Sequence, residues 1–303
     1  MTDILMIGIR FLLFTDLMLV MGLAMFLLYA LRSTEREDVR IVSGLVVLQP
    51  WLCGVGLLVS LGGMLALTAS MQGVAVGEID PNMLVSMAVE TDTGKAWIVR
   101  MLALVVATAA AMQLGRHPRP AALILSLASA SALASLVWSG HAAASEGPAG
   151  TIHRIADALH LIAAGIWIGA IAAFLILLRP ASDDGRQARL DLAARSLEQF
   201  ARVGTACVLV IAATGLINFE MIVGIAQTGQ MPGSSYGYLL IAKLIAFSAM
   251  LLLAACNRWR LAPAFAGATS EKTAGVIRRS LVLEASAAAA VLALVATLGM
   301  LEP

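Results

Sequence analysis

Eight long apolar runs follow one another along this chain, and they limit its fold more than any other feature. A helix needs about 20 predominantly apolar residues to cross the hydrocarbon of a bilayer. Only helices and closed barrels satisfy their backbone hydrogen bonds in lipid, and runs of this length favour helices. We therefore predict an all-α, polytopic transmembrane bundle of about eight helices. The predicted spans lie near residues 5–31, 41–70, 95–115, 121–138, 155–178, 203–226, 238–256 and 281–301.

The composition agrees with this class and excludes others. Apolar residues make up 60% of the chain and charged residues 13%, whereas soluble domains carry about 25% charged residues. A net charge of +1 gives no reason to expect nucleic acid as a partner, and membrane lipid is the expected surrounding. The N-terminal MTDIL lacks the basic segment of a cleavable signal peptide, so we expect the first helix to be retained.

Basic residues gather in alternate loops. Most of the 20 lysines and arginines lie in the loops 32–40, 116–120, 179–202 and 257–280. The loops between these hold only Lys95 and Arg154, at helix edges. Because loops rich in lysine and arginine stay in the cytoplasm, both termini are predicted to lie outside. In a bacterium this means the inner membrane, with both termini in the periplasm.

Two segments suggest an internal repeat. In TGKAWIVR (93–100) and YGYLLIAK (236–243), a glycine opens a helix and a basic residue follows six positions later. Residues 1–138 and 139–303 are therefore predicted to be two four-helix halves running in the same direction. Transporters built from such repeats place their sites at the repeat interface.

The fourth and fifth apolar runs are joined by a hairpin that carries three of the four histidines. His153, Asp157 and His160 are spaced i, i+4, i+7 and share one helix face, and His141 ends the preceding helix. Neutral imidazoles bind metals well, and Asp157 is placed to accept the second N–H of an imidazole. We predict a metal site formed by His141, His153 and His160. Imidazole alone does not select copper over zinc, iron or nickel, and histidines of an outer vestibule can also serve only as hydrogen-bonding groups.

Other charged residues interrupt the apolar runs. Isolated charges in hydrocarbon are unfavourable, so these side chains are expected to pair or to line a wet cavity. We expect Glu220 to pair with Lys243 on the next helix, and Cys207 and Cys256 lie near the cytoplasmic ends of their helices. Structural ion pairs and buried small thiols explain these residues as well as an ion pathway does. The candidate pathway residues are Asp16, Arg100, Glu220, Lys243, Cys207 and Cys256, and Arg10 is a further charge within the first run.

Three segments of the second half together resemble the CopD family of bacterial copper-resistance membrane proteins. The first contains SGHAAA (139–144) and IHRIADALHLIAAGIWIGAI (152–171). The second is FARVGTACVLVIAATGLINF (200–219), which resembles a family helix that ends in a TG-containing turn. The third runs from SSYGYLLIAK (234–243) to RRSLVLE (278–284). The first half resembles the family only in hydropathy and in TGKAW.

This resemblance implies copper homeostasis at the bacterial inner membrane, with copper moving from periplasm to cytoplasm. It implies a transporter rather than an enzyme, and a separate periplasmic copper carrier of the CopC type, because this chain contains no CopC domain. The family's histidines match His141, His153 and His160, and its other recurrent positions match Gly237, Lys243, Asn257 and Arg258. One departure is WIGA (167–170), where the family often has Gly-Gly; Ala170 is small enough to keep close packing.

Two other functions fit the same residues. His141 and His160 on neighbouring helices could be the axial ligands of a haem in a b-type redox protein. A copper sensor, or a scaffold for a periplasmic partner, would need the same outer site without transport.

Overall fold

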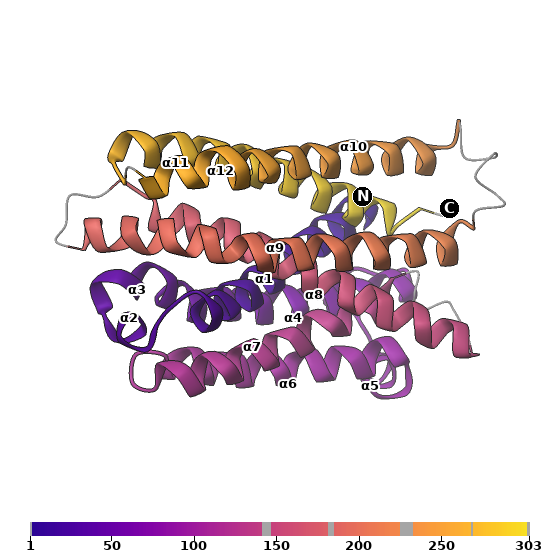
Figure 1. The fold of residues 1–303 in the computed structure, drawn as a ribbon. Helices are drawn as coiled ribbons and strands as arrows, with labels where there is room; N and C mark the ends of the chain where they lie inside the picture. Colours follow the sequence, from indigo (N-terminus) through magenta and orange to yellow (C-terminus); the bar gives the residue numbers. More distant parts are fainter. Residues whose placement is uncertain (1, 141–146, 181–184, 225–232, 268, 302–303) are drawn as a thin grey trace.

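The computed structural model describes residues 2–140, 147–180, 185–224, 233–267 and 269–301, and every regular element in these ranges is helical (Figure 1). The helices are α1 (Thr2–Tyr29), α2 (Ser33–Glu37), α3 (Val39–Val46), α4 (Leu48–Gln72), α5 (Pro81–Glu90), α6 (Asp92–Gln113), α7 (Pro118–Ala134), α8 (Gly147–Leu177), α9 (Arg186–Ile222), α10 (Ser235–Cys256), α11 (Ala262–Gly267) and α12 (Glu271–Leu298). Two short 3-10 helices, η1 (Val76–Glu78) and η2 (Ser135–Ser139), and the π-helix η5 (Asn257–Leu261) complete the described elements.

Eight helical segments are long and apolar enough to cross a membrane, which confirms the predicted polytopic bundle. Each of the eight predicted runs coincides with one of them. The run 41–70 divides into α3 and α4, and Pro50 lies in the first turn of α4, where a missing backbone N–H breaks no helical hydrogen bond. The sixth span is longer than the predicted run 203–226, because α9 begins at Arg186 in the basic loop and continues without a break to Ile222.

The first turns of α9 are tied to the end of α1 and to the segment that follows it. Arg195 forms an ion pair with Glu35 at 2.7 Å. The Gln199 amide donates to the backbone carbonyl of Tyr29 at 2.7 Å, and Arg189 donates to that of Arg40 at 3.1 Å. This end of α9 is therefore fixed to the first half of the chain.

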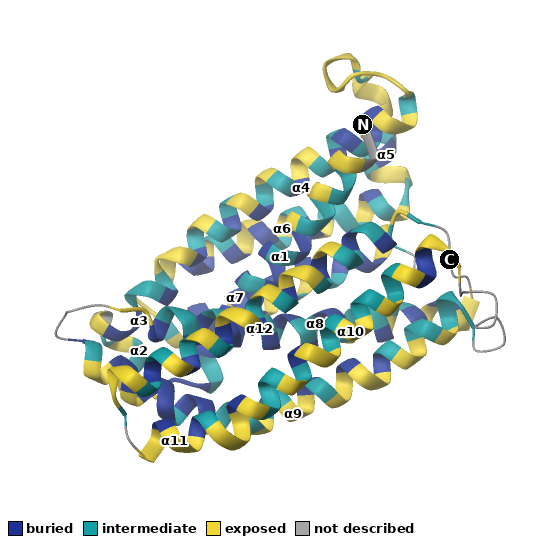
Figure 2. Cartoon of the chain, turned by 90° about the horizontal axis from the view of Figure 1, so that it is seen from above, coloured by how far each residue is buried: buried dark blue, intermediate teal, exposed yellow. Residues whose placement is uncertain are grey.

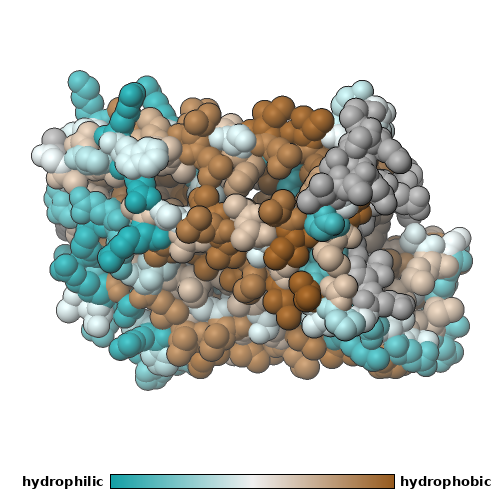
Figure 3. All heavy atoms as spheres, turned by 45° about the vertical axis from the view of Figure 1, so that its right-hand side comes forward, coloured by the Kyte–Doolittle hydropathy of each residue, from teal (hydrophilic) through white to brown (hydrophobic). Residues whose placement is uncertain are grey.

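Both termini lie at one end of the bundle, together with α5, and α2, α3 and α11 lie at the other end (Figure 1). Because the chain has an even number of spans, both termini must lie on the same side of the membrane. A hydrophobic band covers the middle of the molecule, and hydrophilic atoms gather at the end that carries α2, α3 and α11 (Figure 3). The surface therefore has the profile expected of a membrane-spanning protein.

The centre of the bundle is the crossing of α1 and α8. In α1, 67% of the span is buried, compared with 6% in the span that contains α10, and Figure 2 shows the buried faces turned inward. A Cβ atom on Gly22 would lie 2.1 Å from the backbone oxygen of Gly165 and 2.7 Å from the Cα of Gly169. Small residues allow two membrane helices to approach this closely.

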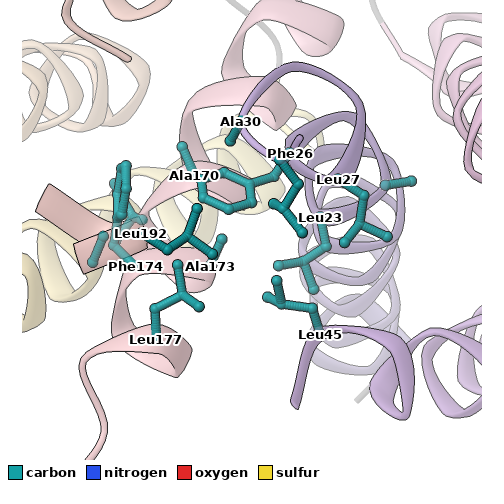
Figure 4. Packing of buried hydrophobic residues seen from close by; sticks show 14 of the residues in the cluster. Leu23, Phe26, Leu27, Ala30, Leu45, Ala170, Ala173, Phe174, Leu177 and Leu192 are labelled. Atoms are coloured by element: carbon teal, nitrogen blue, oxygen red, sulfur yellow. The ribbon is translucent and has the colours of Figure 1, made fainter. Parts of the chain in front are cut away.

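Large apolar side chains fill the space beside the crossing (Figure 4). Phe26 of α1 meets Phe174 of α8 edge-to-face, with ring centroids 5.3 Å apart. Leu23, Leu27 and Leu177 pack in the same cluster. Ala170, which stands where the resembling family often has glycine, is fully buried in it, so a methyl group is accommodated there.

The remaining spans form two sets on either side of this crossing. In the first set, α4 and α7 pack against α1, and α6 packs against α7. In the second set, α9 and α12 pack against α8, and α10 joins them through α12. In the first set α4 also packs against α6. In the second set α10 packs mainly against α12, and a cavity lies between α9 and α10. This cavity holds the candidate site.

Candidate functional site

A cavity of about 520 Å³ is enclosed by α8, α9, α10 and α12, with part of its wall from α1. Apolar side chains form most of that wall. Small-ligand sites usually combine a concave apolar wall with a few placed polar groups. The polar residues lining this cavity are Arg10, His153, Asp157, His160, Asn218, Tyr236 and Lys243.

The predicted helix face on α8 forms one wall of the cavity. His153, Asp157 and His160 all line it, as the i, i+4, i+7 spacing requires, and His153 is only 1% exposed. Seven helical residues advance about 10 Å along the axis. The two imidazoles therefore suit two successive positions along the cavity better than one shared ion.

A closed metal site is not formed by the described residues. Within these ranges, no three His, Cys, Asp or Glu side chains lie close enough to hold one metal ion together. His141, the third predicted ligand, lies in 141–146, outside the described residues. The full set of His141, His153 and His160 thus stays a prediction.

His160 has a defined orientation. Its Nδ1 lies 3.0 Å from the Thr214 hydroxyl oxygen, and that hydroxyl donates its own hydrogen to the Val210 carbonyl at 2.6 Å. The hydroxyl must therefore accept from His160, so Nδ1 carries the proton and Nε2 keeps its lone pair for a cation. Gly215 lies beside the ring, where a Cβ would be 3.6 Å from Cε1 of His160, an ordinary van der Waals distance.

Thr214 was not among the predicted site residues, although the TG dipeptide signalled it. The resemblance suggested a turn at this point. The structure instead places Thr214 and Gly215 inside the uninterrupted α9, where the threonine bonds the imidazole and the glycine lies beside the ring.

Asp157 is the acidic centre of the cavity. Its Oδ1 accepts from the Asn218 amide at 3.1 Å, which joins α8 to α9. Its carboxylate also interacts electrostatically with Arg10 and with Lys243. We expected Lys243 to pair with Glu220, but its acidic neighbour is Asp157 because Lys243 faces the cavity, whereas Glu220 is exposed on α9.

Arg10 closes the end of the cavity that lies near the two termini. Its guanidinium donates to the Ser139 carbonyl at 2.8 Å and lies 6.0 Å from the ring centroid of Phe14. A Cβ on Gly299 would lie 2.1 Å from an Arg10 nitrogen, so the guanidinium packs directly against this glycine. A lone arginine early in an apolar run was the sequence signal for this role.

The other predicted pathway residues do not line the cavity as described. Asp16 and Arg100 are buried in the first set of helices, where Arg100 donates to the Ser60 hydroxyl at 2.7 Å. Cys207 is buried within α9, and Cys256 is exposed at the end of α10. Lys243 alone of the six predicted residues lines the described cavity wall.

Beyond the floor of the cavity lies a buried carboxylate that the sequence prediction did not include. Glu284 of α12 is 2% exposed. It accepts from the Trp167 indole at 2.8 Å and from the Asn257 amide at 2.9 Å. Glu284 is the last residue of the RRSLVLE segment, which resembles the family, but nothing in the sequence indicated a role for it.

Two family models together match most of the chain. "Copper resistance protein D-like, N-terminal domain" matches residues 1–151, and "Copper resistance protein D" matches residues 194–298. The chain is also 39% identical to copper resistance protein D of Pseudomonas syringae pv. tomato, over 100% of this chain and 98% of that protein. This chain belongs to the copper resistance protein D family. The CopD resemblance is thereby confirmed.

Two further relatives agree with this membership. The inner membrane protein YebZ of Escherichia coli (strain K12) is 28% identical over 98% of both chains. The copper transport protein CutJ of Bacillus subtilis (strain 168) is 34% identical over 41% of this chain and 22% of that protein. No solved structure matches the chain. The chain is thus a multi-pass membrane protein of a copper resistance and homeostasis family.

Proposed function

We propose that this protein transports copper from the periplasm to the cytoplasm across the bacterial inner membrane, and that it is not an enzyme. The observation that carries the proposal is a single cavity wall with two imidazoles and a carboxylate in a CopD-family chain. The description of one relative as a copper transport protein supports transport over binding alone. Both termini and the outer end of the cavity are assigned to the periplasm on the distribution of basic loops.

The two histidines are assigned successive roles. Copper is received at His153, with His141 as a further ligand, and passes to His160, whose Nε2 is held ready by Thr214. Soft and borderline copper ions accept imidazole nitrogen as a ligand. The Asp157 carboxylate between them offsets the charge of the ion, and Lys243 beside it keeps the binding weak enough for release.

A periplasmic carrier of the CopC type is the proposed source of copper. Delivery from a carrier would place the metal directly at the outer histidines and avoid free copper. The proposal predicts that such a carrier binds the end of the bundle that holds both termini.

The test is cell-associated copper, measured by mass spectrometry at low external copper and at matched membrane levels of protein. A His153→Ala/His160→Ala variant is expected to lower copper to the level of cells without the protein. His117→Ala is the matched control, because His117 lies outside the cavity in the loop before α7. Copper levels equal to wild type in the double variant would refute import through this cavity.

The same comparison decides between transport and a sensor or scaffold. If wild-type protein binds copper when purified but does not raise cellular copper, the result favours a copper sensor or scaffold without transport. Haem is named in none of the matched descriptions, whereas copper is named in both family models and in two relatives.

A further inference from the structure

Glu284 lies between the cavity and the end of the bundle that carries α11. On α12 it is one turn from Ala288, which lines the cavity, in the direction of α11. Trp167, which donates to Glu284, is itself part of the cavity wall and packs edge-to-face on Phe247 with centroids 6.2 Å apart. The indole therefore separates the cavity from the carboxylate and touches both.

The two described groups that hydrogen-bond to Glu284 are neutral. Trp167 and Asn257 each donate one hydrogen bond, and Glu284 takes part in none of the ion pairs of the described residues. A bare negative charge in the middle of a membrane bundle is unfavourable. Binding a proton removes that charge.

The charged and titratable side chains of the surrounding helices are occupied elsewhere. On α8 and α10, His153, Asp157, His160 and Lys243 face the cavity. On α1, Arg10 closes its outer end and Asp16 lies against Gly56 of α4. On η5, Arg258 bonds the Thr205 hydroxyl and Arg260 is exposed.

Asn257 can serve both protonation states of Glu284. As described, its Nδ2 donates to the carboxylate, and its buried Oδ1 has no hydrogen-bond partner among the described residues. Rotation of the amide by half a turn would let Oδ1 accept from the O–H of a protonated carboxyl. Asn257 begins the π-helix η5, and π-helical turns are frequent at functional sites.

We propose that Glu284 is a proton-binding site whose proton leaves as a monovalent metal cation enters the cavity, so that proton and metal movements are coupled. Trp167 and Asn257 are positioning residues: the indole connects the carboxylate to the cavity, and the amide turns with the proton. The released proton passes to water at the α11 end. The coupling rests on the proposed transport of copper, whereas the proton site itself does not.

The test uses full-length protein in liposomes that enclose a pH-sensitive dye, with Ag⁺ added outside as a redox-inert substitute for Cu⁺. Wild type is expected to change the internal pH when Ag⁺ is added. Glu284→Gln keeps the shape; its oxygen can accept from the Trp167 indole, and its NH2 can donate to Oδ1 of Asn257 once that amide has turned. It cannot release a proton, so the pH change should be lost while Ag⁺ binding stays within about twofold. Glu198→Gln, an exposed glutamate of α9, is the matched control and should behave as wild type.

A pH change in Glu284→Gln equal to that of wild type would overturn the proposal. If wild type binds no Ag⁺, the proposed function fails, and infrared spectroscopy still decides the proton site. A protonated-carboxyl band that is present in wild type, titrates with pH and is absent in Glu284→Gln establishes Glu284 as a proton site. The lack of such a band at every pH refutes it. Asn257→Asp should shift that band, whereas a purely structural asparagine would leave it unchanged.

Discussion

The two sets of helices each contain a cationic side chain, but its surroundings differ between them. Arg100 of α6 and Lys243 of α10 each follow six residues after the glycine near a helix start, and each helix is capped by a hydroxyl that accepts from that glycine, Thr91 or Ser234. Arg100 is 7% exposed and bonds two serines, Ser60 and Ser135. Lys243 instead faces a cavity.

The difference comes from the neighbouring helices. α4 packs against α6 and closes the first set, whereas α9 and α10 leave the cavity open in the second. We propose on this basis that residues 1–138 and 139–303 are two copies of one four-helix unit, one kept closed for stability and the other opened for binding. The same cation then has a structural role in one copy and tunes a ligand site in the other.

The largest expected effect is on stability, at the crossing of α1 and α8 where the two copies meet. Gly22→Ala places a methyl group against the backbone of α8, and we expect destabilisation of at least about 3 kcal/mol. Gly8→Ala, on the same helix with no atom within 4 Å of the new Cβ, should be neutral or slightly stabilising. Thermal unfolding of purified protein in detergent measures both. Equal melting temperatures would show that the crossing does not hold the copies together.

The next effect concerns the open copy alone. Thr214→Val removes the acceptor that fixes the His160 tautomer, and loss of such a group weakens metal binding about 10- to 100-fold. Thr214→Ser retains the hydroxyl and should bind normally. Competition titration of Cu⁺ against a chromophoric chelator compares the two variants, and unchanged affinity in Thr214→Val would remove His160 from the site.

Replacing each of the two cations distinguishes the copies directly. Lys243→Met removes a positive charge beside Asp157, so metal affinity should rise by about tenfold, equivalent to about 1.4 kcal/mol, and release should slow. Arg100→Met should alter the melting temperature but leave metal affinity unchanged. The same titration, with transport rates in liposomes, tests both; an affinity change in Arg100→Met would contradict a purely structural first copy.

The smallest effect is expected where the two copies meet through an ion pair. The Arg195 guanidinium lowers the pKa of Glu35 through hydrogen bonds. Because the folded-state pKa lies below the unfolded one, the pair stabilises the protein above the unfolded pKa of about 4.3 and is lost as the pH falls through the lowered value. We expect a contribution below about 1 kcal/mol. Glu35→Gln should lower the melting temperature slightly at neutral pH and leave it unchanged in acid. Equal shifts of the melting temperature at both pH values would show that the Arg195–Glu35 ion pair does not contribute to stability.

Hydropathy and helical period predicted the features that depend only on the spacing of residues within one helix. The eight spans and the shared face of His153, Asp157 and His160 follow from spacings within one helix, so the sequence contained them. The Glu220–Lys243 pair was wrong because the rotation of one helix against another depends on packing around the whole bundle. Thr214 and Glu284 were missed for the same reason, since both meet their partners across helix interfaces.

The length of α9 and the attachment of its first turns limit how this helix can move. Its 37 residues form a rod about 55 Å long, clearly longer than the hydrocarbon layer of about 30 Å. One end is clamped by Glu35, Tyr29 and the Arg40 backbone, while the other end flanks the cavity. The Asn218–Asp157 hydrogen bond joins that end to α8. A rod clamped at one end is displaced most at the other, so a movement of α9 would change the outer side of the cavity more than the inner side. The proposed transport therefore needs another helix to open the inner side.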